Sequence, residues 1–201
     1  MISAVLLAAG ESKRMGQPKQ LLPLGNKTLV EHALDNLLAS RVGEVILVTG
    51  NQAENVVKKV GTRPVKVILN PDYRQGMSTS LKQGMTSIDK DAAAVMVVLA
   101  DQPFIDAALI NRLIDEFTRR SKGIIVPVFK GKRGHPIIFA IKYRNELLEL
   151  QGDAGAKSLL ERHPGDVLEV PVASEHIHVD IDDMESYELQ KKNLNKQRTE
   201  R

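Results

Sequence analysis

Short apolar runs alternate with segments of helical periodicity along most of this sequence. Residues 93–99 are almost purely apolar, as expected of a strand that is buried on both faces of a sheet. Residues 53–60 and 109–117 instead repeat their apolar side chains at helical spacing. Strands that alternate with helices indicate a largely parallel sheet with helices on both faces. We therefore predict an α/β fold, a single Rossmann-like three-layer sandwich around a mostly parallel (mixed) sheet.

The expected elements follow one another along the chain. Strands are predicted at residues 2–7, 45–48, 65–69, 93–99, 123–128, 136–140, 167–170 and 177–181. Helices are predicted at residues 29–38, 53–60, 76–85, 109–117, 144–150 and 154–162, with a last helix from about residue 183. Thr28 and Glu31 form a capping box for the first helix, and Asp106 caps the fourth. Residues 126–140 break the alternation and predict a hairpin beside the sheet.

Composition limits the class of protein. The chain has 201 residues, of which 42% are hydrophobic, and this suits one sizeable globular domain. No apolar stretch approaches the roughly eighteen residues that a membrane helix needs, so no membrane segment is expected. The absence of cysteine excludes disulfides and thiolate chemistry and fits a cytoplasmic protein.

The net charge of +3 arises in the last part of the chain. Residues 188–201 hold five basic and two acidic side chains, and the remaining residues balance at 23 of each. We therefore predict that residues 191–201 form a basic, frayed tail. Aromatic residues make up only 3% of the chain, so there is no stacking platform and nucleic-acid binding is not expected.

The first strand ends in a loop of small residues, glycines and cations. Gly10 and Gly16 can adopt positive φ angles that bring successive N–H groups to one side, where they would face an anion. Lys13, Arg14 and Lys19 add positive charge to the same stretch. A strand that leads into such a loop predicts a phosphate-binding site. The loop lacks the third glycine of the dinucleotide fingerprint, and the residues after Gly16 do not match the P-loop pattern.

The loop sequence L-A-A-G-x-S-x-R-M-G-x-x-K-x-L-L resembles the signature of MobA-like nucleotidyltransferases, which act on the molybdenum cofactor. It is similar in particular to that of the molybdenum cofactor cytidylyltransferases and the related accessory protein of purine catabolism. L-A-D-Q-P at residues 99–103 and the segment 76–84 match the same family in the expected order. The resemblance covers essentially the whole chain and implies a nucleotidyltransferase domain at residues 1–190, followed by the tail at 191–201.

Asp101 ends the most apolar strand. A buried carboxylate there needs compensation, and Mg²⁺ is the usual oxygen-binding partner where phosphates gather; capping of the next turn is the alternative. The resemblance implies that Asp101 holds the catalytic Mg²⁺ and that residues 180–183 correspond to a D-x-D-T segment. Asp183 replaces the threonine, so the sequence leaves open whether Asp180 or Asp182 reaches the metal. Asp182 or Asp183 could instead cap a helix.

Histidine and aspartate alternate at the last predicted strand. A strand would place the four side chains of His176, His178, Asp180 and Asp182 on one face, a pattern that suggests a transition-metal site. On a strand, side chains at i, i+2 and i+4 already spread over roughly 13 Å, so two neighbours could chelate one ion but four could not.

The segment 76–85 begins a predicted helix with hydroxyl and free N–H groups, which suit the polar edge of a base; plain capping by Ser78 is the alternative. The resemblance implies cytosine contacts from Gly76 and Ser80. The residues that it assigns to the nucleotide are Ala8, Ala9, Gly10, Arg14, Lys19, Gly76 and Ser80. Guanylyl-transferring relatives usually have glycine at position 9, and the methyl group of Ala9 would occupy room that a purine needs, which favours CTP over GTP.

Two further segments, 131–136 and 152–156, resemble the acceptor side of the cytidylyltransferases. This similarity implies that His135 and Asp153 contact the acceptor. A plain turn and a helix start are the alternatives for these two segments.

The resemblance implies transfer of a cytidylyl group from CTP to the terminal phosphate of molybdopterin or molybdenum cofactor, with release of pyrophosphate. Arg14, Lys19 and Asp101, the last through Mg²⁺, would offset the charge on the phosphates, so no side-chain nucleophile is needed. One alternative is a nucleotidyltransferase with a sugar or polyol phosphate acceptor. Another is a non-catalytic carrier that brings the cofactor to a molybdoenzyme of the xanthine dehydrogenase type, but a carrier has no use for a magnesium carboxylate.

Overall fold

The computed structural model describes residues 1–153 and 156–199. The strands are β1 (Ile2–Ala8), β2 (Pro23–Leu24), β3 (Lys27–Thr28), β4 (Glu44–Thr49), β5 (Lys66–Leu69), β6 (Ala94–Leu99), β7 (Ile124–Phe129), β8 (Lys132–Arg133), β9 (Ile137–Ala140) and β10 (Val167–Pro171). The α-helices are α1 (Leu29–Leu38), α2 (Ala53–Val60), α3 (Met77–Ser87), α4 (Ala107–Arg119), α5 (Arg144–Glu149), α6 (Lys157–Arg162) and α7 (Met184–Thr199).

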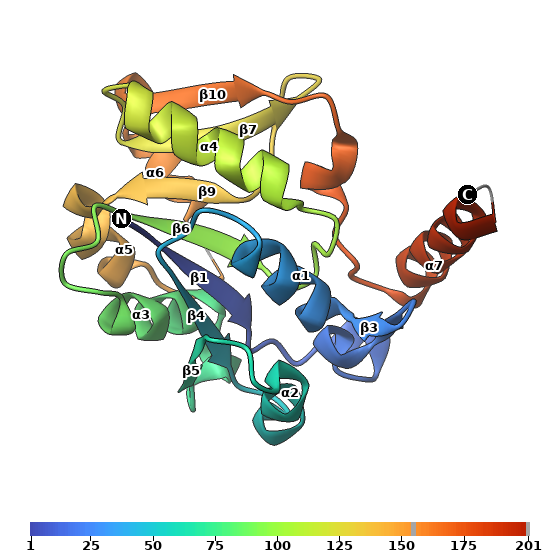
Figure 1. Ribbon diagram of the computed structural model, residues 1–201. Coiled ribbons are helices and arrows are strands. Elements are labelled where there is room, and N and C mark those ends of the chain that lie inside the picture. Colours follow the sequence, from blue (N-terminus) through green and yellow to red (C-terminus); the bar gives the residue numbers. More distant parts are fainter. Residues whose placement is uncertain (154–155, 200–201) are drawn as a thin grey trace.

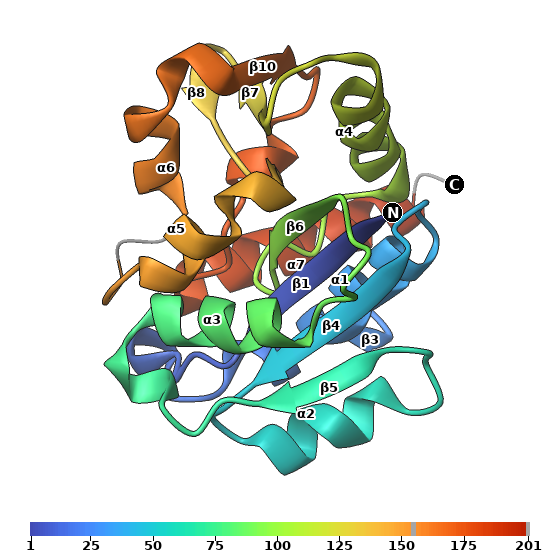
Figure 2. The same ribbon diagram turned by 90° about the vertical axis from the view of Figure 1, so that its left-hand side faces the viewer.

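The main sheet is mixed and mostly parallel, as predicted. Its strands lie in the order β10-β7-β9-β6-β1-β4-β5 (Figure 1), and β8 is paired to β7 (Figure 2). Neighbouring strands among β1, β4, β5 and β6 pair in parallel, as do β7 and β10. β9 runs antiparallel to both β6 and β7 and lies between them, so the hairpin expected at residues 126–140 is formed within the main sheet and not beside it. The small β2–β3 sheet was not anticipated by the sequence pattern.

Helices cover both faces of the sheet (Figures 1 and 2). Leu6 of β1 belongs to an apolar cluster with Leu34 of α1 and Leu113 of α4. The next residue, Leu7, points the other way, into a cluster with Leu81 of α3. Successive side chains of a strand point to opposite faces, so β1, which is buried throughout and apolar except for Ser3, requires a helix layer on each side. The predicted three-layer α/β sandwich is confirmed.

The strand predicted at residues 177–181 is wrong. Residues Glu175–His178 form a 3₁₀-helix instead, and residues 179–182 have no regular structure. Ile177 is buried there against Gly134, where an added Cβ would lie only 2.5 Å from the Ile177 carbonyl oxygen. The rings of His176 and His178 pack against different aromatic side chains, with centroid distances of 5.4 and 6.3 Å. The alternating face suggested by the sequence is therefore not formed.

The C-terminal part also differs from the expectation. α6 begins at Lys157, later than the predicted residue 154, and Ala154 and Gly155 lie outside the described residues. The helix expected from about residue 183 is present as α7 and continues to Thr199, so the boundary drawn at residue 190 falls within it. Glu200 and Arg201 lie outside the described residues, and the division into domain and tail stays a prediction. In the described part of the chain, no helix has both the length and the apolarity to cross a membrane.

A cluster of polar groups ties β7 to the turn before β10. The Asp166 carboxylate accepts hydrogen bonds from the Tyr143 hydroxyl and, at 3.0 Å, from the Gly123 N–H, and it pairs with Lys142 Nζ at 2.6 Å. Burial opposes the charge on Asp166, but these partners, Lys142 foremost, lower its pKa to about 2.

We expect this cluster to make stability fall in acid. The pKa of Asp166 is lower in the folded than in the unfolded chain, so its stabilisation is present above pH 4 and is lost as the pH falls toward 2. The loss in the free energy of unfolding should be about 2 kcal/mol. Urea unfolding followed by circular dichroism between pH 2 and 7 measures it. In Asp166→Asn this part of the pH dependence should disappear, and an unchanged slope would show that other carboxylates cause it.

Candidate active site

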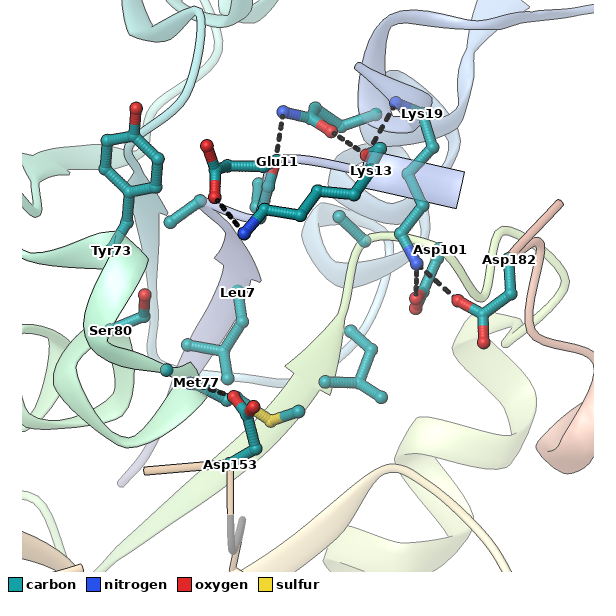
Figure 3. Close-up of a pocket in the computed structure, with 18 of the residues that line it drawn as sticks. Leu7, Glu11, Lys13, Lys19, Tyr73, Met77, Ser80, Asp101, Asp153 and Asp182 are labelled. Atoms are coloured by element: carbon teal, nitrogen blue, oxygen red, sulfur yellow. Dashed lines mark hydrogen bonds and ion pairs between the residues drawn. The ribbon is translucent and has the colours of Figure 1, made fainter. Parts of the chain in front are cut away.

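Two adjoining cavities open at the carboxyl ends of β1 and β6, the edge of an open α/β sheet where ligands bind, and Figure 3 shows residues that line the first of them. The first cavity, of about 430 Å³, is lined by the loop after β1, the start of α3 and the end of β6. The second, of about 380 Å³, extends toward β9 and α6. Both are lined by Arg14, Lys19, Asp101 and Asp182. The predicted phosphate-binding and metal-binding side chains therefore lie where the two cavities meet.

The loop after β1 turns at Ser12 and Gly16, which have positive φ angles of 55° and 65°. Gly10 does not have such an angle, so the turn expected of both glycines is made by Gly16 and by Ser12. The Ser12 hydroxyl accepts a hydrogen bond of 3.0 Å from the Lys19 N–H, which holds the end of the loop against its start. A Cβ added to Gly10 would have no atom within 4 Å. The space beside Gly10 lets a ligand approach its backbone closely.

Lys19 lies between two carboxylates (Figure 3). Its Nζ pairs with Asp101 Oδ2 and lies 2.7 Å from Asp182 Oδ1. Arg14 Nη2 lies 3.0 Å from the other oxygen of Asp182. Burial opposes the charge on Lys19, but Asp101 and Asp182 outweigh it and raise the pKa of Lys19. Burial likewise opposes the charge on Asp182, but Lys19 and Arg14 lower its pKa, so both partners are charged at neutral pH.

Asp180 lines the second cavity but has a different partner. The buried Gln102 donates from Nε2 to Asp180 Oδ1 at 2.6 Å. Burial and the nearby charge of Asp101 raise the pKa of Asp180. Asp182, in contrast, pairs with Lys19, the same cation that pairs with Asp101. This geometry favours Asp182 over Asp180 as the second carboxylate toward a metal.

The Asp101 carboxylate fits a divalent cation. Its Oδ1 is buried and has no hydrogen-bond partner in the described part of the chain, a costly state that a cation would relieve. Together with Asp182, it offers the hard oxygen ligands that Mg²⁺ and Mn²⁺ prefer. Within residues 1–153 and 156–199 there is no group of three or more potential metal ligands, so the alternation at residues 176–182 does not build a transition-metal site.

Gly76 and Ser80 line the first cavity at the start of α3. Gly76 has φ 113°, and an added Cβ would lie 2.6 Å from the Gly152 backbone, so a side chain does not fit here. The Ser80 hydroxyl accepts a 2.9 Å hydrogen bond from Nδ2 of the fully buried Asn70. Asn70 thereby fixes the position of Ser80 while its hydroxyl proton stays available to a ligand.

Ala8, Ala9 and Gly10 also line the first cavity, as predicted. Ala9 is only 3% exposed, and a Cβ added to Gly50 would lie 2.9 Å from the Ala9 methyl group. The Ala9 carbonyl accepts a 3.1 Å hydrogen bond from the Asn51 N–H. The methyl group of Ala9 therefore packs against the loop at Gly50 and Asn51. An effect of Ala9 on the choice between cytosine and guanine would thus act partly through the position of this loop.

His135 and Asp153 line the second cavity, and Asp153 lines the first as well. Asp153 Oδ1 accepts a 3.1 Å hydrogen bond from the Met77 N–H at the start of α3. Burial and the positive charge of Lys157 lower the pKa of His135 to about 4. The imidazole is therefore neutral at physiological pH.

A family model described as "MobA-like NTP transferase domain" matches residues 4–167. The chain belongs to the MobA-like NTP transferase family. The matched range contains the loop after β1, Lys19 and Asp101, and it ends before Asp180 and Asp182.

Relatives of this MobA-like protein carry different functional names. Nicotine blue oxidoreductase of Paenarthrobacter nicotinovorans is 32% identical over 198 residues, covering 92% of this chain and 93% of that protein. Molybdenum cofactor cytidylyltransferase of Escherichia coli (strain K12) is 27% identical over 182 residues, covering 90% and 91%. Family membership therefore establishes the nucleotidyltransferase class more firmly than the substrate.

Solved structures of MobA-like relatives share the whole fold. Rv0371c of Mycobacterium tuberculosis H37Rv superposes with a TM-score of 0.87 at 29% identity, covering 95% of this chain and 97% of that one. A complex of Rv0371C with manganese superposes with a TM-score of 0.84 at 28% identity, with the same coverage. A structural relative thus binds a divalent metal, in accord with the oxygen ligands found here.

Three buried polar residues of the site were missed by sequence reasoning. Gln20 donates to the carbonyls of Gly10 and Asn51 at 3.4 Å each, Asn70 holds Ser80, and Gln102 holds Asp180. Asn70 directly follows the apolar run of β5, and Gln102 lies beside Asp101 in the L-A-D-Q-P segment; these signals could have drawn attention to them. All three position other groups of the MobA-like site.

Proposed function

We propose that the protein is a cytidylyltransferase that depends on CTP and Mg²⁺ and acts on the terminal phosphate of molybdopterin or molybdenum cofactor. The observation that carries this proposal is the meeting of two cavities at Lys19, Asp101 and Asp182. A nucleotide in the first cavity and an acceptor in the second would bring their phosphates together there. The similarity to the cytidylyltransferase of Escherichia coli (strain K12) supports the same choice of substrates.

The reaction needs positioning and charge compensation rather than a side-chain nucleophile. An oxygen of the acceptor phosphate forms a bond to the α-phosphorus of CTP, and the bond from that phosphorus to the α–β bridging oxygen breaks to release pyrophosphate. The acceptor phosphate is already an anion, so no proton has to be removed. Arg14 and Lys19 would bind phosphate oxygens and offset the charge on the leaving group. Mg²⁺, held by Asp101 and Asp182, would neutralise further phosphate charge when bound.

The remaining site residues would distinguish the two substrates. The cytosine and ribose would contact Ala8, Ala9, Gly10, Gly76 and Ser80 in the first cavity. The acceptor would contact His135 and Asp153 in the second. A molybdoenzyme of the xanthine dehydrogenase type is the proposed destination of the product.

Nucleotide choice tests this function directly. The protein is incubated with Mg²⁺, molybdenum-loaded molybdopterin and each of the four NTPs in turn, and pyrophosphate release is measured. We expect kcat/KM for CTP to exceed that for GTP by about a hundredfold, the scale set by one or two contacts that reject a larger base. A preference for GTP would overturn the cytidylyl assignment. Turnover with a sugar phosphate but not with molybdopterin would overturn the acceptor, and cofactor binding without pyrophosphate release would indicate a carrier.

A second candidate function is oxidation or reduction of a small molecule. The observation in its favour is the 32% identity to nicotine blue oxidoreductase over 92% of the chain. Against it, the loop after β1 lacks the three-glycine dinucleotide fingerprint. Oxidation of NADH or NADPH by an electron-accepting dye, followed by absorbance without NTP, tests it. Redox turnover in a protein that releases no pyrophosphate would replace the transferase proposal.

A further inference from the structure

The second cavity contains a cation that the proposed transfer does not use. Lys157, the first residue of α6, lines this cavity and does not line the first one. Its side chain is exposed, and among the described residues it has no ion pair or hydrogen bond. Its charge nevertheless reaches the cavity wall, because it helps to lower the pKa of His135. Lys157 is therefore available to an incoming anion.

Charge in the second cavity is otherwise unfavourable to an anion. Four carboxylates line it: Asp101, Asp153, Asp180 and Asp182. The two other lining cations, Arg14 and Lys19, are already paired with Asp101 or Asp182. A phosphate that enters from the α6 side would meet repulsion from these carboxylates unless a free cation offsets it. Within the described chain, Lys157 is the one lining cation without such a pairing.

The rest of the second cavity offers apolar surface to a bound ring. Leu81, Val97, Leu99 and Ala156 contribute apolar surface, and the His135 imidazole is neutral. An apolar wall with a few polar groups is typical of small-molecule sites, and about 380 Å³ is within their usual range.

We propose that Lys157 binds the phosphate group of the acceptor, so that the second cavity selects a ring-bearing molecule with a phosphate over the same ring without one. That the bound molecule is the acceptor of cytidylyl transfer rests on the function proposed above. The preference of the cavity for a ring with a phosphate does not. Lys157 is a binding residue in this scheme and takes no part in breaking the phosphate bond.

Binding of a ring with and without a phosphate tests the inference without any turnover. Riboflavin and flavin mononucleotide share a fluorescent heteroaromatic ring and differ by one phosphate. Titrations are made without metal, both with and without excess CMP, the nucleotide that the proposed function would place in the first cavity. We expect flavin mononucleotide to bind the wild-type protein about tenfold more tightly than riboflavin, the scale of one charged contact. Lys157→Met should remove this difference and Lys157→Arg should keep it.

Lys90→Met is the matched control, since it removes the same charge from the exposed turn before β6, at the end of the sheet opposite the cavities. It should leave both titrations unchanged. Equal binding of the two flavins to the wild-type protein, no measurable binding of either up to the solubility limit of riboflavin, or an unchanged preference in Lys157→Met would each overturn the inference.

A second arm separates this inference from the proposed function. With CTP, Mg²⁺ and molybdopterin, Lys157→Met should raise KM for the acceptor about tenfold and leave KM for CTP within about twofold. If the wild-type protein releases no pyrophosphate but its flavin preference depends on Lys157, the transferase proposal fails and the Lys157 inference stands. If transfer proceeds and Lys157→Met changes neither the acceptor KM nor the flavin preference, the Lys157 inference alone fails.

Discussion

Asp101→Asn is expected to lower kcat/KM for cytidylyl transfer by about a thousandfold or more, the scale of losing a metal-binding charge in a phosphoryl-transfer site. Asparagine keeps the size of the side chain and removes the negative charge that Lys19 and the metal would both contact. The buried Oδ1 of Asp101 has no hydrogen bond in the described part of the chain. In the asparagine variant, the oxygen at this place would no longer carry the negative charge that binds a cation. Pyrophosphate release over a range of Mg²⁺ concentrations measures the effect, and circular dichroism checks that the variant is folded.

Asp180→Asn provides the matched control for this experiment. Asp180 is held by the Gln102 amide rather than by a cation, so the same change should reduce kcat/KM by less than about tenfold. Mn²⁺ binding in the presence of CTP, followed by electron paramagnetic resonance, should be lost in Asp101→Asn and kept in Asp180→Asn. Near-normal turnover of a folded Asp101→Asn protein, or equal damage from both variants, would refute the assignment of the metal to Asp101 and Asp182.

Lys19→Met is expected to change catalysis and metal binding in opposite directions. Loss of a cation beside the phosphates should reduce kcat by about a hundredfold to a thousandfold. The Lys19 ammonium contacts Asp101 and Asp182, the same carboxylates that a metal would use. Its removal should therefore tighten Mn²⁺ binding to the nucleotide-free protein, by about tenfold, because a positive charge no longer competes for these oxygens.

Isothermal titration with Mn²⁺ and steady-state kinetics on the same preparation measure the two effects. Lys90→Met again removes one lysine charge far from the cavities and should change neither quantity. Weaker Mn²⁺ binding in Lys19→Met would mean that Lys19 supports the metal site instead of competing for it. An unchanged kcat would remove Lys19 from the transfer step.

Local apolar patterns were sufficient to predict most of the fold. α2 begins and ends at the predicted residues, and β1 and β6 differ from the prediction by a single residue, because burial on both faces makes a strand almost wholly apolar. Sheet topology also explains why Lys19 and Asp101 meet although 82 residues separate them. Both follow strands whose carboxyl ends lie at the same edge of the sheet.

Contacts between distant segments could not be predicted in the same way. The alternation of His176 and His178 resembles a strand, but the burial of Ile177 against Gly134 gives a 3₁₀-helix, and that contact depends on the β7–β9 hairpin. The choice between Asp180 and Asp182 likewise depends on whether Gln102 or Lys19 lies beside each carboxylate. The spacing of residues along the sequence does not indicate which of these side chains lie beside each other.

The ion pairs of Asp182 connect the beginning of the chain with its last segment. Asp182 is 163 residues from Lys19 and 168 from Arg14, and it lies beyond the residues 4–167 that the family model matches. A ribosome therefore releases the phosphate-binding loop long before it releases Asp182, and a nascent chain lacks a complete centre until the segment with Asp182 has also emerged. For the same reason, a chimera that exchanges only residues 4–167 between relatives would combine Lys19 and Asp101 of one protein with the Asp182 segment of another.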